Sequence, residues 1–371
     1  MSQRPRVLLL IPHLGGGGAE RVTELLTRHL SSDKYELHLC LVTQDEVSDS
    51  PFPPWITLHA INARRVRHGT FRILSLVRHL RPQVVLSNMV HLNFLVLLLK
   101  PLFPRETHVL VRQNGTFSSM LRLAKSTVIT SFLYRLLYRR ADGVLCQSSH
   151  MADDLHQFAG IPLRLLAVLP NPVDIDTILS TKTASPSRWL GPGPHLLAVG
   201  RLSHEKGFDI LLDAFVLLKS RFPGADMTIV GQGPEEAAVK ARCRRLGLDS
   251  AVHFTGYVAS PAAFFKGTTL FVISSRHEGM PNALLEAAAA GLPIVATSAS
   301  GGLFDLLNQQ PGVWLAREVS AKSLAESLTC ACVALHANDR FSHKWIDSFR
   351  LDHAIPAYER TIDAALAKGY R

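Results

Sequence analysis

The sequence has few aromatic residues and few cysteines. Only 7% of the residues are Phe, Trp or Tyr, which argues against a surface that binds nucleic-acid bases by stacking. The five cysteines are dispersed, and the Cys330/Cys332 pair has no second Cys or His pair at zinc-ligand spacing. We therefore expect neither a metal site nor a disulfide framework, and this cysteine usage indicates a reducing, cytoplasmic compartment.

Long apolar runs are also missing. The first run, over residues 7–11, is too short for the core of a signal peptide and ends at Pro12. The longest other run, over residues 92–103, is interrupted by Lys100 and Pro101 and falls well below the roughly 20 apolar residues of a membrane span. We expect no membrane-spanning segment.

Acidic residues are nearly absent from one stretch of the chain. Between Asp49 and Asp142 the only acidic residue is Glu106, whereas 14 Arg or Lys residues occur there. Apolar residues alternate with the basic ones over 71–81 and 132–140, a pattern typical of helices that lie on an anionic membrane surface. Such a field attracts polyanions in general, and an ordinary solvated basic face is the alternative interpretation.

The remaining pattern is that of a parallel α/β protein. At 371 residues the chain is long enough for two domains. Short apolar runs separated by helix-length segments indicate buried parallel strands with helices on both faces. The expected strands form two series, at 7–11, 37–42, 84–87, 109–111 and 143–146, and then at 195–199, 227–230, 253–255, 270–274, 293–296 and 313–315.

A Pro-rich and then Ser/Thr-rich stretch separates the two series and predicts a linker. We assign residues 1–175 to a first doubly wound domain, 176–194 to the linker and 195–350 to a second domain, with a cleft between the two. In such sheets ligands bind at the carboxyl ends of the strands.

The first candidate site is a run of four glycines, Gly15 to Gly18, directly after the first strand. Consecutive glycines carry a large entropic cost, and a strand, a Gly-rich turn and a helix would bring backbone N–H groups close to an anion. The spacing matches neither a P-loop nor the dinucleotide fingerprint. A tight connection without a ligand is the alternative.

The second candidate is the turn after the expected strand at 195–199. Here Gly200 and Gly207 flank Arg201 and Lys206. A planar guanidinium fork and an ammonium group on one turn, beside a helix start, form a receptor suited to a diphosphate. Two exposed cations with surface partners are the alternative.

The third candidate surrounds a helix that we expect between Pro281, at its first position, and Gly291, just after its end. Glu278 precedes this helix and Glu286 lies on its second turn. A carboxylate in such a loop can accept hydrogen bonds from sugar hydroxyls, and one on the helix can reach a ribose. A capping role for Glu278 is the alternative.

These segments together resemble glycosyltransferase family 4. Glu278 and Glu286, separated by seven residues, resemble the paired glutamates of that family, and the Gly200 to Gly207 turn resembles its diphosphate site. The loop at 15–20 resembles its N-terminal donor-facing loop. Further matches occur at 230–235, 252–256 and 300–302, so the resemblance extends over nearly the whole chain and is strongest from 195 to 305.

This resemblance implies a retaining hexosyltransferase of the GT-B fold, in which two Rossmann-like domains face each other and a helix over 351–371 returns to the first domain. It implies that Arg201 and Lys206 bind the diphosphate, Glu278 the transferred sugar, Glu286 the ribose, and the backbone at 256–258 the base. The donor-binding set is Gly16, Gly17, Gly200, Arg201, Lys206, Gly256, Tyr257, Val258, Glu278, Gly279, Met280, Pro281, Asn282, Leu285 and Glu286.

One position departs from the family pattern. Many relatives have a His after the strand that corresponds to 109–111, near the reacting sugar, whereas this chain has Gln113 and Asn114. Their amides can hydrogen-bond a hydroxyl but cannot act as a general base. His91, near the end of the preceding strand, is the remaining acceptor-side candidate, and a structural role is its alternative.

We therefore expect transfer of a sugar from a nucleotide-diphosphate-sugar, with uridine favoured as the base, to a lipid-linked glycan at the inner face of the cytoplasmic membrane, as in surface polysaccharide synthesis. No cofactor is expected, and no metal, because Asp174 and Asp176 lie where the first domain passes into the expected linker. An epimerase or sugar phosphorylase on the same fold is the alternative within enzymes. A basic membrane-binding protein without catalysis is the alternative outside them.

Overall fold

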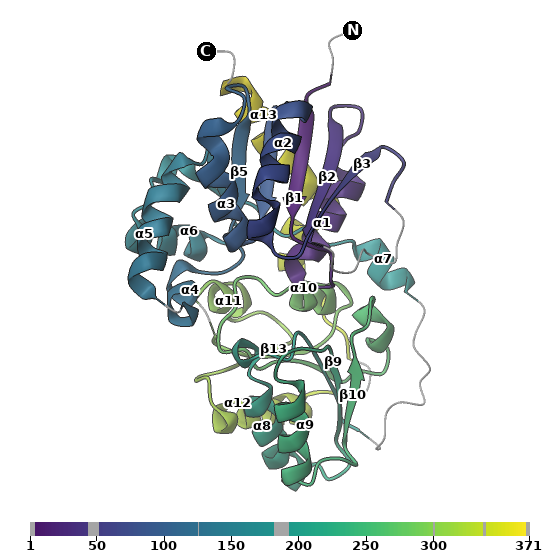
Figure 1. Ribbon diagram of the computed structural model, residues 1–371. Helices are drawn as coiled ribbons and strands as arrows, with labels where there is room; N and C mark the ends of the chain where they lie inside the picture. The colour runs from purple at the N-terminus through teal and green to yellow at the C-terminus, as the bar shows by residue number, and fades with distance from the viewer. Residues whose placement is uncertain are drawn as a thin grey trace. The chain divides into compact units, whose positions relative to one another are not determined.

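The chain forms two compact units. In this computed structural model, residues 4–43, 52–124, 126–181, 193–299, 301–336 and 339–368 are described. Unit 1 comprises Met1–Pro172 together with Ser348–Arg371, and unit 2 comprises Val173–Asp347 (Figure 1). Most of the expected linker, residues 182–192, lies outside the described residues.

Unit 1 is built on a seven-stranded sheet in the order β3-β2-β1-β4-β5-β6-β7, and all its strand pairs are parallel. Its strands are β1 (Arg6–Ile11), β2 (Glu36–Thr43), β3 (Ile56–Ala63), β4 (Val84–Asn88), β5 (His108–Arg112), β6 (Gly143–Cys146) and β7 (Leu166–Val168). Its helices are α1 (Gly18–His29), α2 (Thr70–Leu80), α3 (Val90–Leu99), α4 (Phe117–Leu123), α5 (Thr127–Leu137), α6 (Ser149–Ala159) and α13 (Leu351–Lys368).

Strand β1 shows why the strands are continuously apolar. Successive side chains of a strand point to opposite faces of the sheet. Val7 and Leu9 join a core cluster that contains residues of α1 and α13, whereas Leu8 and Leu10 join a second cluster with residues of α2 and α3. Helices thus cover both faces, and a strand in this position has no solvent-facing row of polar side chains.

The C-terminal helix α13 packs on the sheet of unit 1. Its buried residues Ile355, Tyr358 and Ile362 recur at intervals of three and four, which is the spacing of one helix face. At the rim of this contact Glu359 accepts hydrogen bonds from the Ser31 backbone N–H and from Lys34 Nζ. An apolar stripe with a polar edge therefore attaches the end of the chain to the first unit.

Unit 2 is built on a six-stranded parallel sheet in the order β10-β9-β8-β11-β12-β13. Its strands are β8 (His195–Val199), β9 (Asp226–Val230), β10 (Val252–Gly256), β11 (Leu270–Ile273), β12 (Ile294–Thr297) and β13 (Val313–Ala316). Its helices are α7 (Ile175–Ser180), α8 (Phe208–Arg221), α9 (Glu236–Arg245), α10 (Asn282–Ala289), α11 (Gly301–Leu307) and α12 (Ala321–Ala334).

All eleven expected strands are present, with ends within two residues, but sequence reasoning missed β3 and β7. Both are edge strands of the first sheet, and neither is continuously buried, so they lack the apolar run that marks the central strands. Another correction concerns Pro281, which caps α10 rather than occupying its first helical position.

Asp174 caps a helix where part of the linker was expected. Its carboxylate accepts hydrogen bonds from the Thr177 N–H and from Thr177 Oγ1, at 3.0 and 2.6 Å, and so starts α7. Within the described parts of the chain, no group of three His, Cys, Asp or Glu side chains is arranged to hold a metal ion. No helix among those residues is long and apolar enough to cross a membrane.

Candidate functional site

Two of the predicted site residues of unit 2, Lys206 and Glu278, lie at the point where the strand order reverses. Strands β8 and β11 are neighbours in the sheet although β9 and β10 come between them in the sequence. The loop after β8 carries Lys206, on a short 3-10 helix (His204–Lys206), and the loop after β11 carries Glu278. Because parallel strands end at the same edge, this is where an open α/β sheet binds its ligands.

Lys206 and Glu278 form a direct ion pair. Lys206 Nζ lies 2.5 Å from Glu278 Oε1, and the same oxygen accepts a hydrogen bond of 2.7 Å from Ser275 Oγ. The side chains are 23% and 10% exposed, so the pair is sheltered but open to solvent on one side. Neither residue was expected to be the partner of the other.

A glycine allows the two loops to approach. Gly207 has φ +63°, and a Cβ atom there would lie 2.1 Å from the Ser274 carbonyl oxygen. Ser274 Oγ in turn donates to the Lys206 carbonyl at 2.9 Å. Only glycine fits this backbone conformation and this contact, which explains why the cation loop ends in Lys-Gly.

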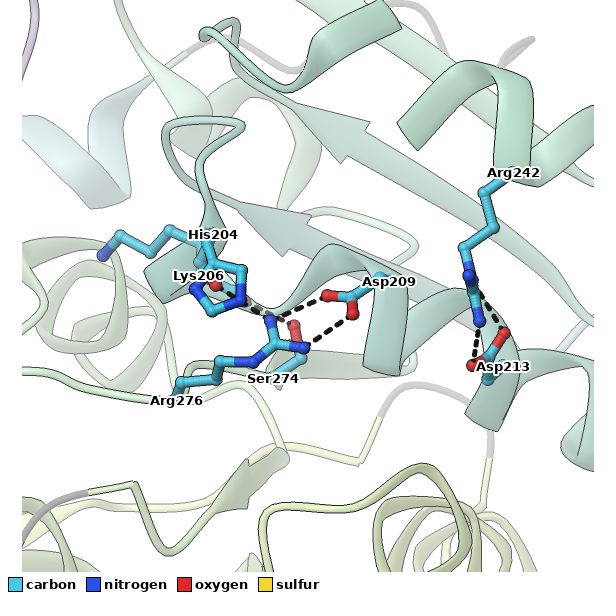
Figure 2. A network of polar contacts seen from close by, with 7 residues as sticks. All are labelled: His204, Lys206, Asp209, Asp213, Arg242, Ser274 and Arg276. Carbon is cyan, nitrogen blue, oxygen red and sulfur yellow. Dashed lines mark hydrogen bonds and ion pairs between the residues drawn. The ribbon is translucent and has the colours of Figure 1, made fainter. Parts of the chain in front are cut away.

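A second ion pair, which sequence reasoning missed, links this loop to α8. Arg276 contacts both carboxylate oxygens of Asp209, at 2.8 and 2.6 Å, and donates to the His204 carbonyl at 2.9 Å. The guanidinium of Arg276 lowers the pKa of Asp209. Figure 2 shows Arg276 spanning between the loop and α8, while the Lys206 side chain extends away from this network.

The other donor-site candidates of unit 2 differ in exposure. Arg201 is exposed, and its guanidinium makes no hydrogen bond or ion pair with the residues that the structure describes. Leu285 is fully buried and belongs to the core. Met280 and Pro281 are buried, Tyr257 is 47% exposed, and Gly200, Gly256, Val258, Gly279, Asn282 and Glu286 are partly exposed.

A small cavity lies beside the Lys206–Glu278 pair. It is lined by residues of β8, β11 and the loops that follow them, including Val199, Ser275, Pro281 and Ala283. The first residues of α10 therefore contribute to its wall, so the positive end of that helix dipole faces the same space. An apolar wall with one cation and one carboxylate suits a ligand that carries both phosphate and hydroxyl groups.

The glycine run of unit 1 lies at the corresponding edge of its own sheet, where β1 and β4 are neighbours. Gly15 and Gly16 are exposed, and Gly16 has φ +83°. Helix α1 begins at Gly18 without a side-chain cap at Gly17. Glu20, in the first turn, is only 3% exposed, which is unusual for a carboxylate.

The acceptor-side candidates of unit 1 occupy different environments. Gln113 is fully buried, and its amide bonds to the Gly115 carbonyl, Tyr134 OH and Tyr138 OH. Asn114 is partly exposed. The His91 ring is exposed, although partial desolvation and the nearby His13 lower its pKa.

An unexpected buried cation holds Asn114. Arg112, at the end of β5, is 1% exposed, and its guanidinium donates to side-chain oxygens of Asn88, Asn114 and Asn171 and to Tyr358 OH. Among the described residues no acidic side chain pairs with it. In the stretch after β5, where the resemblance implies a His, the amide of Asn114 is therefore held by a buried arginine.

Comparison with solved structures defines the class. The Anabaena protein HepE, solved with UDP and glucose, aligns with 97% of this chain and 100% of its own at a TM-score of 0.79 and 17% identity. Together with the two parallel α/β units of seven and six strands, this match shows that the protein has the GT-B fold.

Family comparison then makes the assignment specific. The model described as Glycosyltransferase Family 4 matches residues 16–177, and the model described as Glycosyl transferases group 1 matches residues 193–332. The chain belongs to glycosyltransferase family 4. This confirms the resemblance that the paired glutamates and the glycine-flanked cations indicated.

Two curated relatives illustrate the range of the family. A transferase of Campylobacter jejuni, named N-acetylgalactosamine-N,N'-diacetylbacillosaminyl-diphospho-undecaprenol 4-alpha-N-acetylgalactosaminyltransferase, is 26% identical over 80% of this chain and 82% of its own length. An uncharacterized glycosyltransferase of Methanocaldococcus jannaschii is 24% identical over 66% of this chain. The aligned part spans 62% of that archaeal protein.

Proposed function

We propose that the enzyme transfers a sugar from a UDP-sugar to a lipid-linked glycan acceptor, with retention of the anomeric configuration. The uridine nucleotide is supported by HepE, which was solved with UDP. The lipid-linked acceptor is supported by the name of the Campylobacter relative, whose substrate is a diphospho-undecaprenol. The observation that carries the proposal is the Lys206–Glu278 ion pair at the β8/β11 switch point.

The pair provides a simple exchange of partners. In the free protein Glu278 neutralises Lys206. A donor diphosphate would take over Lys206, and the carboxylate would then accept hydrogen bonds from hydroxyls of the transferred sugar. The exposed Arg201 would supply a second, bidentate contact to the same diphosphate. Lys206 thereby has an anionic partner in both states, and the Glu278 carboxylate has hydrogen-bond donors in both, so neither partly buried charge is left without a partner.

Catalysis in this scheme is stabilisation of the leaving group. As the acceptor oxygen bonds to the anomeric carbon, the bond from that carbon to the diphosphate oxygen breaks, and the diphosphate leaves with the electron pair. Attack from the same face retains the configuration and lets the leaving oxygen take the acceptor's proton. Lys206, Arg201 and the start of α10 would stabilise the developing negative charge. No step in this scheme requires a metal ion.

The remaining donor contacts follow the family pattern. Glu286 would bind the ribose, and the backbone at 256–258 would bind the base beside the exposed Tyr257 ring. Gly16, Gly17, Gly200, Gly279, Met280, Pro281 and Asn282 would contribute close backbone or side-chain contacts. Backbone groups would bind the base, and a panel of nucleotide sugars distinguishes uridine from guanosine carriers.

The test is a panel of nucleotide sugars with slow release of the nucleotide as the readout. Release from one donor, lost in Lys206→Ala and Glu286→Ala, is the expected result. Lys240→Ala is the matched control, because Lys240 also pairs with a glutamate at 2.7 Å but on α9, away from the cavity. Release that is undiminished in Lys206→Ala contradicts the proposed role of the ion pair.

The membrane surface forms a second part of this proposal. Helix α5 exposes Val128, Ile129, Phe132 and Leu136, by 77, 61, 61 and 44%, at spacings that place them along one side of a helix. A groove beside Phe132 is lined by residues of α4 and α5. The helix contains no acidic residue, and exposed arginines lie at 122, 135, 139 and 140. This combination favours an anionic bilayer.

Vesicle sedimentation tests the membrane surface. We expect the protein to sediment with phosphatidylglycerol vesicles and not with phosphatidylcholine alone, and Phe132→Ser to reduce the bound fraction several-fold. Leu217→Ser, which removes an exposed leucine of α8 in unit 2, is the control and leaves binding unchanged. Equal binding to both lipid compositions would contradict an electrostatic contribution.

A further inference from the structure

A histidine and a buried glutamate share one contact point beneath the glycine loop of unit 1. His13 lies just after β1, and its side chain is 28% exposed. Its Nδ1 atom accepts a hydrogen bond of 3.1 Å from the Gly15 N–H. The same atom lies 3.8 Å from Glu20 Oε1, a buried oxygen without a hydrogen-bond partner.

The glycines leave the space that these side chains occupy. A Cβ at Gly15 would lie 3.0 Å from His13 Nδ1, and a Cβ at Gly17 would lie 2.4 Å from Glu20 Oε2. Two of the four glycines are therefore explained by side chains of the protein itself. The glycine loop therefore packs against the side chains of His13 and Glu20.

The two partners of Nδ1 require opposite protonation of that atom. To accept from the Gly15 N–H, Nδ1 must be unprotonated, so the neutral ring carries its proton on Nε2. To donate to Glu20 Oε1, Nδ1 must carry the proton, and Nε2 then becomes a hydrogen-bond acceptor. The described geometry satisfies the first arrangement and leaves Glu20 Oε1 unpaired, although buried oxygens normally have partners.

We infer that His13 is the acceptor-binding histidine of this enzyme and that Glu20 orients it once a diphosphate has drawn the Gly15 N–H away. The inference rests on the proposed function, which supplies the diphosphate. Gly15 and Gly16 are exposed residues just before the start of α1, and backbone N–H groups in such a place are suited to an anion. When Gly15 turns to that anion, the ring changes tautomer: the proton on Nε2 is lost to solvent and a proton from solvent binds Nδ1, so the ring stays neutral. Nδ1 then donates to Glu20 Oε1, and Nε2 accepts a hydrogen bond from an acceptor hydroxyl.

This arrangement replaces the histidine that is missing after β5. Asn114 takes that position but is held by Arg112 and Asn88, and an amide offers no second protonation state. His91 has no buried carboxylate bonded to it among the described residues. Asn88 Nδ2 also donates to the Ala19 carbonyl at 3.1 Å, so the Asn88 side chain contacts both Asn114 and the start of α1.

Ring-nitrogen NMR of the full chain, labelled with ¹⁵N-histidine, tests the inference without an identified acceptor. His13→Asn assigns the signals, and those of His343, a buried histidine of unit 2, serve as the internal control. Titrations use UDP in one arm and geranyl diphosphate in the other, because the diphosphate can come from the nucleotide donor or from a lipid-linked acceptor. Glu20→Gln, nearly isosteric with the native residue, tests the orienting role.

The expected result is an unprotonated Nδ1 in the free protein and, with one of the two ligands, exchange of the protonated and unprotonated signals between Nδ1 and Nε2. In Glu20→Gln the exchange is reduced at least tenfold in population ratio. Unchanged signals at saturation with both ligands, a protonated Nδ1 in the free protein, or protonation of both nitrogens on binding would overturn the inference. Failure of UDP to bind would count against the proposed function, and the geranyl diphosphate arm would still decide the role of His13.

Discussion

The carboxyl edges of the two sheets hold charge in opposite ways. In unit 2 a lysine and a glutamate pair at a partly exposed edge, with Lys206 23% and Glu278 10% exposed. In unit 1 the arginine at the end of β5 is 1% exposed and is surrounded by neutral amide and hydroxyl oxygens. The first arrangement can exchange its partners with a charged ligand. The second is closed to ligands and fixes the side chains around it.

The largest expected effect breaks the exchangeable pair. In Glu278→Gln, Lys206 loses its carboxylate and becomes free for a diphosphate, so UDP should bind as tightly as before or more tightly. Turnover of the donor should nevertheless fall on the order of 10²-fold, as for the loss of one preorganised polar group at a reacting centre. Calorimetric titration with UDP and the nucleotide-release assay measure the two effects.

Glu236→Gln is the control for this variant, because Glu236 pairs with Lys240 on α9 and should change neither quantity. Parallel losses of UDP affinity and turnover in Glu278→Gln would mean that Glu278 positions Lys206 instead of exchanging with the donor.

The same contrast explains what the sequence could predict. Lys206, Glu278 and the central strands are recognisable because charge between glycines and uninterrupted apolar runs are local patterns. The partner of Arg276, 67 positions away at Asp209, leaves no local pattern. The environment of Arg112 could not be predicted either, since a basic residue at the end of a strand gives no local sign of its partners. These partners are three asparagines far apart in the sequence, Asn88, Asn114 and Asn171. Long-range polar contacts of this kind emerge only when the sheet order is known.

The next prediction concerns the closed arrangement in unit 1. Arg112→Met removes one donor from each of three asparagine oxygens and should lower the free energy of unfolding by about 3 kcal/mol, since several buried hydrogen bonds to a charged group are lost together. Arg276→Met in unit 2 removes a partly exposed pair with Asp209 and should cost about 1 kcal/mol or less. Urea denaturation of both variants measures the two losses of unfolding free energy. Similar losses would contradict the expectation that the buried Arg112 contributes more to stability than the partly exposed Arg276–Asp209 pair.

A smaller effect is expected from the glycine between the loops of unit 2. Gly207→Ala places a methyl group against the Ser274 carbonyl and strains a backbone at φ +63°, whereas Gly247→Ala meets φ +68° with nothing within 4 Å. Backbone strain alone costs roughly 1 kcal/mol, so Gly247→Ala should lose about that much. Gly207→Ala should lose more and should also weaken UDP binding. Equal losses of stability with unchanged UDP affinity would mean that the close approach of the loops is dispensable.

The smallest expected effect is a difference between the two units in how the free energy of unfolding depends on pH. Burial lowers the pKa of His38 and of His59 in unit 1, and the two rings contact each other at 3.1 Å. A histidine with a lowered pKa in the folded state binds protons more readily when unfolded, so stability is present above the ordinary histidine pKa and is lost as the pH falls below it. In unit 2 burial lowers the pKa of His343, whose Nε2 bonds to the Leu292 carbonyl. Because unit 1 contains a contacting pair, His38→Gln should flatten the fall in unfolding free energy between pH 7 and 5 more than His343→Gln does. Urea titrations at several pH values give the two slopes, and identical slopes would show that the His38–His59 contact adds nothing to the acid sensitivity of unit 1.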